Sequence, residues 1–311
     1  RQKKNLMTTA KITDILNKKI PAERLIADAD MKQYTSFKAG GRADLLVMPG
    51  SYDDLVYITD ILKAEKTPYM IMGNGSNILV KDGGYRGVII RIDDRFSDIQ
   101  VRGTSIIAGA GALMSSVARK ALEAELAGFE FASGIPGSIG GGVFMNAGAY
   151  GGEIADVIEY AKVLEKASGS IKQIPASELE LSYRHSALQQ SGDIVLEVKL
   201  NLKKGSYGDI AEKMKTLTAR RNEKQPVNYP SAGSFFKRPE GYFAGKLVQD
   251  ADLKGVSVGG AEVSQLHSGF LINKGGATAT DIIQLMRIVQ AAVMERFGVM
   301  LEPEVRIIGE E

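Results

Sequence analysis

Cysteine is absent from all 311 positions of the sequence. Disulfides, thiolate metal sites, iron–sulfur clusters and a cysteine nucleophile are therefore excluded. Histidine is nearly absent too: the only two are His185 and His267, and no carboxylate stands at a metal-like spacing from either. We interpret both histidines as structural residues and predict no metal site.

Long apolar runs and an excess of one charge are also missing. No stretch approaches the roughly 18 consecutive apolar residues of a membrane-spanning helix, and no apolar signal segment follows the basic residues 1–4. Lysine and arginine exceed aspartate and glutamate by 39 − 37 = 2, so no overall field favours nucleic acid or acidic lipid. The sequence therefore predicts a cytoplasmic protein with no membrane insertion and no nucleic-acid partner.

The composition is otherwise that of an ordinary folded protein, with 44% hydrophobic and 24% charged residues. At about 150 residues per domain, the length predicts two or three domains. Glycine is the exception, because its 35 residues gather in a few clusters. These clusters are the first place to look for function.

The first third of the chain alternates between strand and helix patterns. A helix is predicted to begin after Ser51, whose hydroxyl can cap it, with Leu55, Ile58, Ile61 and Leu62 on one side. The other predicted elements here are a weak helix over 6–20, strands over 69–72, 78–80, 87–92 and 105–108, and a helix over 113–124. Such alternation is typical of an α/β arrangement.

Beyond residue 150 the pattern changes to strands joined by tight turns. Strands over 157–165, 171–174 and 194–202 predict an antiparallel sheet, and a charged helix over 207–224 ends before Pro226. The remaining predicted elements are a helix over 242–250, strands near Val256 and Phe270, a helix from Thr280 capped by Gly298, and a strand over 304–308. The chain as a whole is predicted to be α+β.

Two glycine-rich segments carry the clearest functional signal. Residues 73–77 (Gly-Asn-Gly-Ser-Asn) lie between two predicted strands, and residues 135–142 precede a short apolar helical turn. Without Cβ atoms, backbone N–H groups can converge on a phosphate, and a helix N-terminus favours its negative charge. For either segment alone, tight turns packed against the neighbouring backbone are the better explanation, but two such segments in one α/β half indicate a pyrophosphate site. Neither has the spacing of a Rossmann or a Walker loop.

Three polar residues are candidates for chemistry. Ser234 lies in a small-residue turn before two phenylalanines, Arg184 follows a tyrosine, and Glu304 opens the last predicted strand. Each also has an ordinary explanation, as a turn residue, a surface ion pair and a solvated carboxylate respectively. A serine hydrolase is not supported, because no G-x-S-x-G motif is present.

Seven short segments together resemble the UDP-N-acetylenolpyruvoylglucosamine reductases, the MurB family of peptidoglycan precursor synthesis. They are residues 73–77, 134–141 (Gly-Ile-Pro-Gly-Ser-Ile-Gly-Gly), 146–150 (Asn-Ala-Gly-Ala-Tyr), 183–186 (Tyr-Arg-His-Ser), 224–226 (Lys-Gln-Pro), 232–237 (Ala-Gly-Ser-Phe-Phe-Lys) and 301–306 (Leu-Glu-Pro-Glu-Val-Arg). They occur in family order and span about residues 35–308. Each segment alone is weak evidence for the family, but the combination of all seven is highly specific for it.

The resemblance implies a two-lobed FAD-binding fold of the vanillyl-alcohol-oxidase type and a C-terminal α+β substrate domain. The implied domains are 1–92 with 302–311, then 93–223, and 224–301 for the substrate. FAD would bind without a covalent link, since no cysteine exists and neither histidine lies in a glycine segment. The implied cofactor-binding residues are Gly73, Asn74, Gly75, Ser76, Asn77, Gly111, Ser133, Ile135, Pro136, Gly137, Ser138, Gly140 and Gly141.

The resemblance also implies a reaction and its residues. NADPH would reduce FAD, and the flavin would pass the hydride to the enolpyruvyl ether of UDP-N-acetylglucosamine, giving UDP-N-acetylmuramate. Arg184 would stabilise the developing negative charge, Ser234 would donate the proton, and Glu304 would assist protonation. The implied substrate-binding residues are Tyr150, Tyr183, Lys224 and Gly233. We expect the enzyme to be a monomer.

The sequence indicates the shorter, second type of this family. Only seven residues separate Ser186 from the strand predicted at Ile194, so the segment with a substrate-covering tyrosine is missing. Arg238 also replaces an asparagine that is common after Phe-Phe-Lys. Two alternatives stay open: an FAD-dependent oxidase of the same fold, and a non-catalytic protein that binds sugar nucleotides.

Overall fold

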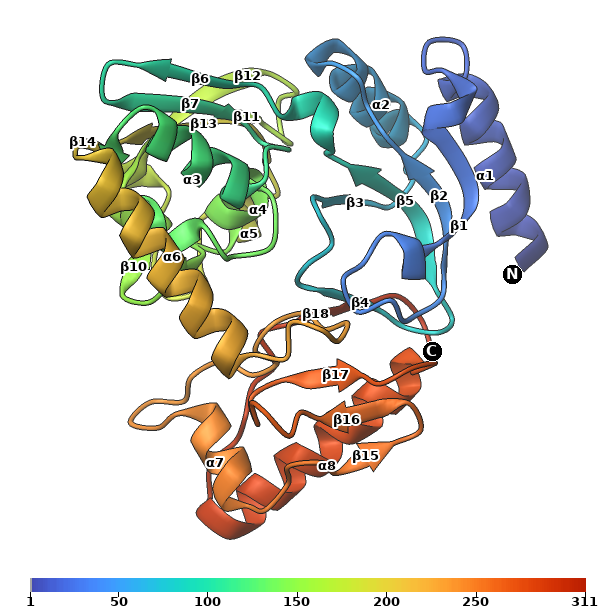
Figure 1. Cartoon of the computed structure of the whole chain (residues 1–311). Coiled ribbons are helices and arrows are strands. Elements are labelled where there is room, and N and C mark those ends of the chain that lie inside the picture. The colour runs from blue at the N-terminus through green and yellow to red at the C-terminus, as the bar shows by residue number, and fades with distance from the viewer. Residues whose placement is uncertain (1) are drawn as a thin grey trace. The chain divides into compact units, whose positions relative to one another are not determined.

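The computed structural model describes residues 2–311 (Figure 1). The chain divides into two compact units. The first unit comprises the residues up to Ile26 together with Leu46–Asn74 and Val88–Arg220. The second unit comprises Ala27–Leu45, Gly75–Gly87 and Arg221–Glu311. The three-domain division given above stays a prediction. Within residues 2–311, no helix combines the length and apolarity that a membrane span requires.

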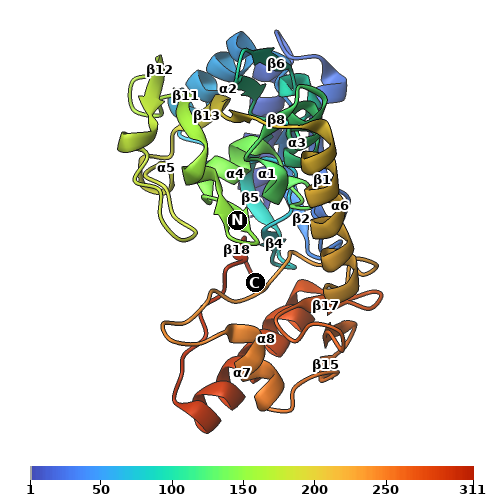
Figure 2. The same ribbon diagram turned by 60° about the vertical axis from the view of Figure 1, so that its left-hand side comes forward.

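The first unit contains a five-stranded sheet in the order β12-β11-β13-β7-β6, antiparallel throughout. Figure 2 shows β11, β12 and β13 side by side. The strands are β6 (Ile99–Arg102), β7 (Ser105–Gly109), β11 (Ile158–Leu164), β12 (Ile171–Pro175) and β13 (Ile194–Asn201). Helices α3 (Met114–Glu123) and α4 (Ile139–Phe144) pack on this sheet. The antiparallel prediction is confirmed, whereas β6 was not predicted.

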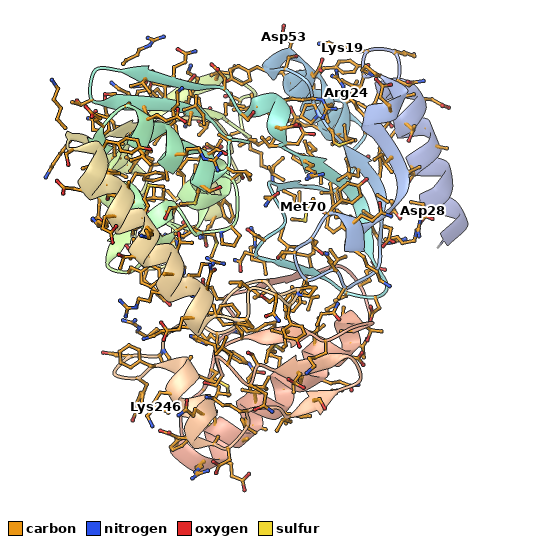
Figure 3. All side chains as sticks on the ribbon, in the orientation of Figure 1. Lys19, Arg24, Asp28, Asp53, Met70 and Lys246 are labelled. Atoms are coloured by element: carbon orange, nitrogen blue, oxygen red, sulfur yellow. The ribbon has the colours of Figure 1, made fainter. Side chains whose placement is uncertain are left out.

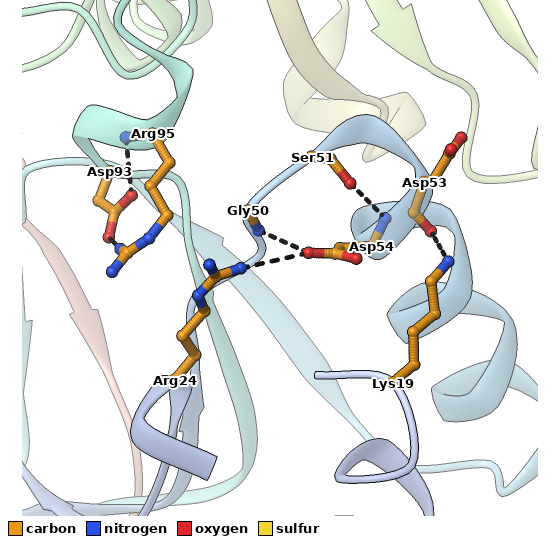
Figure 4. A network of polar contacts seen from close by, with 8 residues as sticks. All are labelled: Lys19, Arg24, Gly50, Ser51, Asp53, Asp54, Asp93 and Arg95. Atoms are coloured by element: carbon orange, nitrogen blue, oxygen red, sulfur yellow. Dashed lines mark hydrogen bonds and ion pairs between the residues drawn. The ribbon is translucent and has the colours of Figure 1, made fainter. Parts of the chain in front are cut away.

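Helix α2 (Tyr52–Ala64) is fixed at its start by a small polar network (Figures 3 and 4). The Ser51 hydroxyl accepts a hydrogen bond from the Asp54 amide at 3.1 Å, as predicted for the cap. The Asp54 carboxylate accepts one from the Gly50 amide at 2.9 Å and lies 3.5 Å from the Arg24 guanidinium. Leu55, Ile58 and Leu62 are buried, and Ile61, three residues after Ile58, is partly buried.

The strands around α2 form a four-stranded sheet in the order β1-β2-β5-β3. Their bounds are β1 (Leu25–Asp30), β2 (Arg42–Val47), β3 (Tyr69–Met72) and β5 (Tyr85–Arg91). Strands β3 and β5 match the predicted ranges closely, and they pair in parallel from Tyr69 opposite Val88. Strands β1 and β2 were not predicted.

The remaining helices and short strands lie near their predicted places where a prediction existed. Helix α1 (Gln2–Leu16) starts and ends about four residues before the predicted range, and α6 (Tyr207–Lys224) matches its range at both ends. The elements without a prediction are α5 (Leu188–Ser191), β8 (Leu126–Ala127) paired with β14 (Lys203–Lys204), and β9 (Gly148–Ala149) paired with β10 (Gly152–Glu153).

The second unit is built on helix α8 (Ala279–Phe297). A three-stranded antiparallel sheet, β15 (Ser257–Val258), β16 (Ala261–Val263) and β17 (Leu271–Asn273), packs on it, as does α7 (Ala244–Asp250). The buried core here includes Leu79, Phe235, Val248, Val263, Leu271, Leu285 and Val289. Helix α7 begins two residues later than predicted.

The last strand, β18 (Arg306–Ile308), returns to pair in parallel with β4 (Ile78–Val80). It begins two residues later than predicted, which leaves Glu304 in the extended segment before it. The end of the chain is thereby tied to the segment that follows the first glycine cluster.

Helix α8 is capped from two sides. The Thr278 hydroxyl accepts a hydrogen bond from the Asp281 amide, and Gly298 ends the helix with φ +67°, as predicted. The carboxylate of Asp82, in the turn after β4, accepts bonds from the Ala279 amide at 2.9 Å and the Thr280 amide at 2.8 Å. Burial alone would raise the pKa of Asp82, but these bonds and one from the Thr280 hydroxyl outweigh it and hold the pKa below its usual value.

We expect Asp82→Ala to lower the free energy of unfolding by about 1–2 kcal/mol at pH 7, as for other helix caps. Because the pKa of Asp82 is lowered in the folded state, its contribution is present above the unfolded-state pKa and is lost as the pH falls through the folded-state pKa. Urea unfolding at pH 7 and near pH 3 measures this, with the exposed Glu240→Ala as control. An equal loss at both pH values would assign the effect to packing instead of charge.

Candidate active site

The two glycine segments meet in the first unit, at Gly73 and Ser138. A Cβ atom added at Gly73 would lie 2.3 Å from the Ser138 hydroxyl oxygen, closer than such atoms can approach. A side chain at position 73 would therefore displace the Ser138 hydroxyl from this position. The sequence indicated both segments as candidates, and the structure shows that they touch.

The second segment is partly helical, which the sequence analysis did not foresee. Helix α4 begins at Ile139, so Gly140 and Gly141 belong to its first turn and do not precede it. The Ile139 amide donates to the Ala112 carbonyl at 2.8 Å and the Gly140 amide to the Ala110 carbonyl at 2.9 Å. These two amides are already engaged, so a phosphate at this helix would have to use other donors. Gly140 is needed for packing, since its Cβ would lie 2.9 Å from that of Ala110.

Gly111 is also explained by packing. A Cβ atom there would lie 1.8 Å from the Asp93 carbonyl oxygen. Its predicted contact with a cofactor stays a prediction.

Ser133, just before the second segment, has a side-chain hydroxyl that makes no hydrogen bond within the described residues. Its hydroxyl oxygen is also buried. An unsatisfied buried hydroxyl typically costs about 1–3 kcal/mol. A ligand rich in hydroxyl and phosphate oxygens would satisfy it, so the segment fits a flavin dinucleotide.

The end of the first segment is fastened to the last residues of the chain within the second unit. The Asn77 side-chain amide donates to the Glu304 carbonyl at 3.2 Å, and the Arg306 amide donates to the Asn77 carbonyl at 3.0 Å. Gly75 adopts φ +66°, and a Cβ atom there would lie 2.1 Å from the Tyr34 carbonyl oxygen. Asn77 and Glu304, 227 residues apart in sequence, are therefore neighbours.

Ser234 lies on a segment that pairs with the one carrying Glu304. The Glu304 amide donates to the Phe235 carbonyl at 2.8 Å, and Phe236 faces Pro303 in an antiparallel bridge. Phe235 and Phe236 are buried, whereas Ser234, the preceding residue, is exposed. The two buried phenylalanines thus place Ser234 beside the segment that carries Glu304. Gly233, with φ +78°, has open space on its Cβ side.

Arg184 and Tyr150 both lie in two-residue turns of the first unit, Arg184 as the second residue of its turn and Tyr150 as the first. Arg184 has φ +54° in a turn closed by the Ser182–His185 bridge, and Tyr150 has φ +54° in the turn that joins β9 to β10. The Arg184 guanidinium donates to the Gly148 carbonyl at 3.5 Å and lies 5.1 Å from the ring centre of Tyr183. The structure thus gathers Arg184, Tyr183 and Tyr150. Lys224 is the exposed last residue of α6.

Asn146 holds the Arg184 turn in place, a role that the sequence analysis missed. Its side chain is fully buried, donates to the Ser182 carbonyl at 3.0 Å and accepts from the Ala155 amide at 2.9 Å. The Ser186 hydroxyl donates to the Phe144 carbonyl at 2.7 Å. A polar residue inside a glycine-rich segment was the available signal, but the partners are distant in sequence.

The two histidines have structural surroundings. The His267 ring packs on Phe270 and accepts a hydrogen bond from the Gly269 amide, and burial lowers the pKa of this imidazole. His185 closes the Arg184 turn through its backbone. No group of three or more metal-ligating side chains occurs in the described part of the chain.

Comparisons with known proteins cover nearly the whole chain. Residues 43–174 match the model of an FAD-binding domain, and residues 225–308 match that of the UDP-N-acetylenolpyruvoylglucosamine reductase C-terminal domain. The reductase of Alkaliphilus oremlandii is 50% identical over 98% of this chain and 100% of its own length. The reductase of Clostridium novyi is 51% identical over 97% and 96%, respectively.

A solved structure agrees with the sequence comparison. The crystal structure of the reductase from Thermus caldophilus superimposes with a TM-score of 0.79 at 34% identity, over 92% of this chain and 98% of that one. The predicted FAD-binding fold with a C-terminal reductase domain is confirmed. The chain belongs to the UDP-N-acetylenolpyruvoylglucosamine reductase family, FAD-dependent oxidoreductases of peptidoglycan precursor synthesis.

Proposed function

We propose that this chain reduces the enolpyruvyl ether of UDP-N-acetylglucosamine to UDP-N-acetylmuramate, with NADPH as the hydride donor. The observation that carries the proposal is the 50% identity over nearly the full length to a reductase of this name. Bound FAD would supply the chemistry by accepting a hydride from NADPH and delivering it to the terminal alkene carbon of the substrate. The residues of the chain would bind the cofactor, orient the substrate and supply the proton.

The glycine segments are the proposed FAD site. The orphan hydroxyl of Ser133 and the close approach of Gly73 to Ser138 support this assignment. The remaining proposed contacts are Asn74, Gly75, Ser76, Asn77, Gly111, Ile135, Pro136, Gly137, Gly140 and Gly141.

Arg184 is proposed to stabilise negative charge. When hydride adds to the terminal carbon, charge develops on the neighbouring carbon and spreads into the carboxylate. A guanidinium stays charged at neutral pH and pairs well with a carboxylate. Its backbone is fixed in a turn, and its bond to the Gly148 carbonyl limits its freedom.

Ser234 is proposed to donate the proton to that carbon, assisted by Glu304. A hydroxyl is a weak acid, but the carbon is then strongly basic, and positioning supplies much of the rate. The backbone pairing of Phe235 with Glu304 supports a shared role for these two residues.

The substrate is proposed to contact Tyr150, Tyr183, Lys224 and Gly233. The Lys224 ammonium suits the diphosphate, and residues 224–301 would form the substrate domain. We further propose that the enzyme acts as a monomer in the cytoplasm, where NADPH and UDP-sugars are available.

Ser133→Ala tests the cofactor site. We expect FAD to bind about five- to tenfold more weakly, as for the loss of one hydrogen bond. The apoprotein should be as stable or more stable, because an unsatisfied hydroxyl is removed. Flavin fluorescence titration and urea unfolding measure the two quantities, with Ser116→Ala on α3 as control. A loss of apoprotein stability with unchanged FAD affinity would contradict the assignment.

Ser234→Ala tests the protonation step. We expect flavin reduction by NADPH to persist, whereas substrate reduction falls on the order of a hundred- to ten-thousand-fold. Stopped-flow absorbance of the flavin follows both half-reactions, and Ser231→Ala in the same turn is the control. If both half-reactions slowed equally, Ser234 would not be the proton donor.

A further inference from the structure

Helix α6 places a guanidinium on the ring of Tyr150. The Arg220 side chain stacks 5.3 Å from the ring centre, and both residues belong to the first unit. We infer that Arg220 is a positioning residue, which fixes the Tyr150 ring for contact with the substrate. This inference rests on the proposed function, because it takes Tyr150 as a substrate contact.

Burial alone does not fix the Tyr150 ring. The residue is 40% exposed and sits at φ +54°, a backbone conformation that tyrosine adopts at a cost. The following Gly151 has no atom within 4 Å of its Cβ position, so the turn is open on that side. A cation on one ring face therefore restricts a side chain that the turn leaves exposed.

The contact between Arg220 and Tyr150 also links α6 to the Arg184 turn, because the β9–β10 hairpin contacts both. The hairpin β9–β10 carries Tyr150 and offers the Gly148 carbonyl to Arg184. Arg220 thus holds the hairpin at its tip, and Arg184 holds it two residues earlier. Two arginines act on one hairpin, and the proposed substrate contact lies at its tip.

The chemistry selects a cation at position 220. A guanidinium over an aromatic ring is attracted by the negative ring face. Lysine preserves the charge and part of the contact, whereas glutamine is shorter and uncharged and preserves neither. Lys215 is an exposed cation on the same helix and gives a matched control.

The test compares Arg220→Gln, Arg220→Lys and Lys215→Gln in the FAD-loaded enzyme, with steady-state kinetics in enolpyruvyl-UDP-N-acetylglucosamine. For Arg220→Gln we expect KM to rise about two- to fivefold, the size of an exposed cation–π contact, with kcat changed less than twofold. Arg220→Lys should recover part of the loss. Lys215→Gln should leave KM, FAD content and thermal stability unchanged.

A double-mutant cycle separates the inference from the proposed function. In the Tyr150→Leu background, Arg220→Gln should have no further effect on KM. If Tyr150→Leu raises KM but Arg220→Gln does not, or if the two effects simply add, the inference is wrong and the proposed function stands. If Tyr150→Leu leaves KM unchanged, both the substrate role of Tyr150 and the inference fall. Absence of NADPH-dependent turnover in the FAD-loaded parent would overturn the proposed function itself.

Discussion

The pairing of the last strand with β4 is the constraint on which the second unit depends. Because Arg306 lies opposite Ile78, the residues just before it run past Asn77 on one side and past Phe235 on the other. The amide of Asn77 and the carbonyl of Phe235 both bond to the backbone of Glu304. One short parallel pair therefore brings a glycine segment, the backbone of Glu304 and the turn of Ser234 into one hydrogen-bonded network.

Long periodic elements of this fold could be predicted from the sequence, and short strands could not. Helix α6 matched at both ends, since its eighteen residues form one long charged stretch that ends before Pro226. Strand β6 has only four residues, with Ile99 and Val101 alternating with polar neighbours. Strand β1 buries only two of its six residues. Such elements take their conformation from the neighbouring strands, which a local pattern does not contain.

The candidate site could also be predicted only in part from the sequence. Glycine at position 73 was a visible signal, because a close backbone approach excludes a Cβ atom. Its partner Ser138 and the buried amide of Asn146 were recognisable only as polar residues among glycines. Their roles depend on atoms 36 to 65 positions away along the chain, as with Asn146 and Ser182.

Backbone strain becomes informative only when it is combined with contacts. Nine residues other than glycine have positive φ in the part of the chain that is described, and most are ordinary turn residues such as Lys66 and Glu180. Arg184 and Tyr150 differ because their turns are bonded to each other and each carries a guanidinium against an aromatic ring. Glycine or asparagine would adopt either turn at lower energy. The large side chains at these positions are therefore better explained by what they contact than by what the backbone requires.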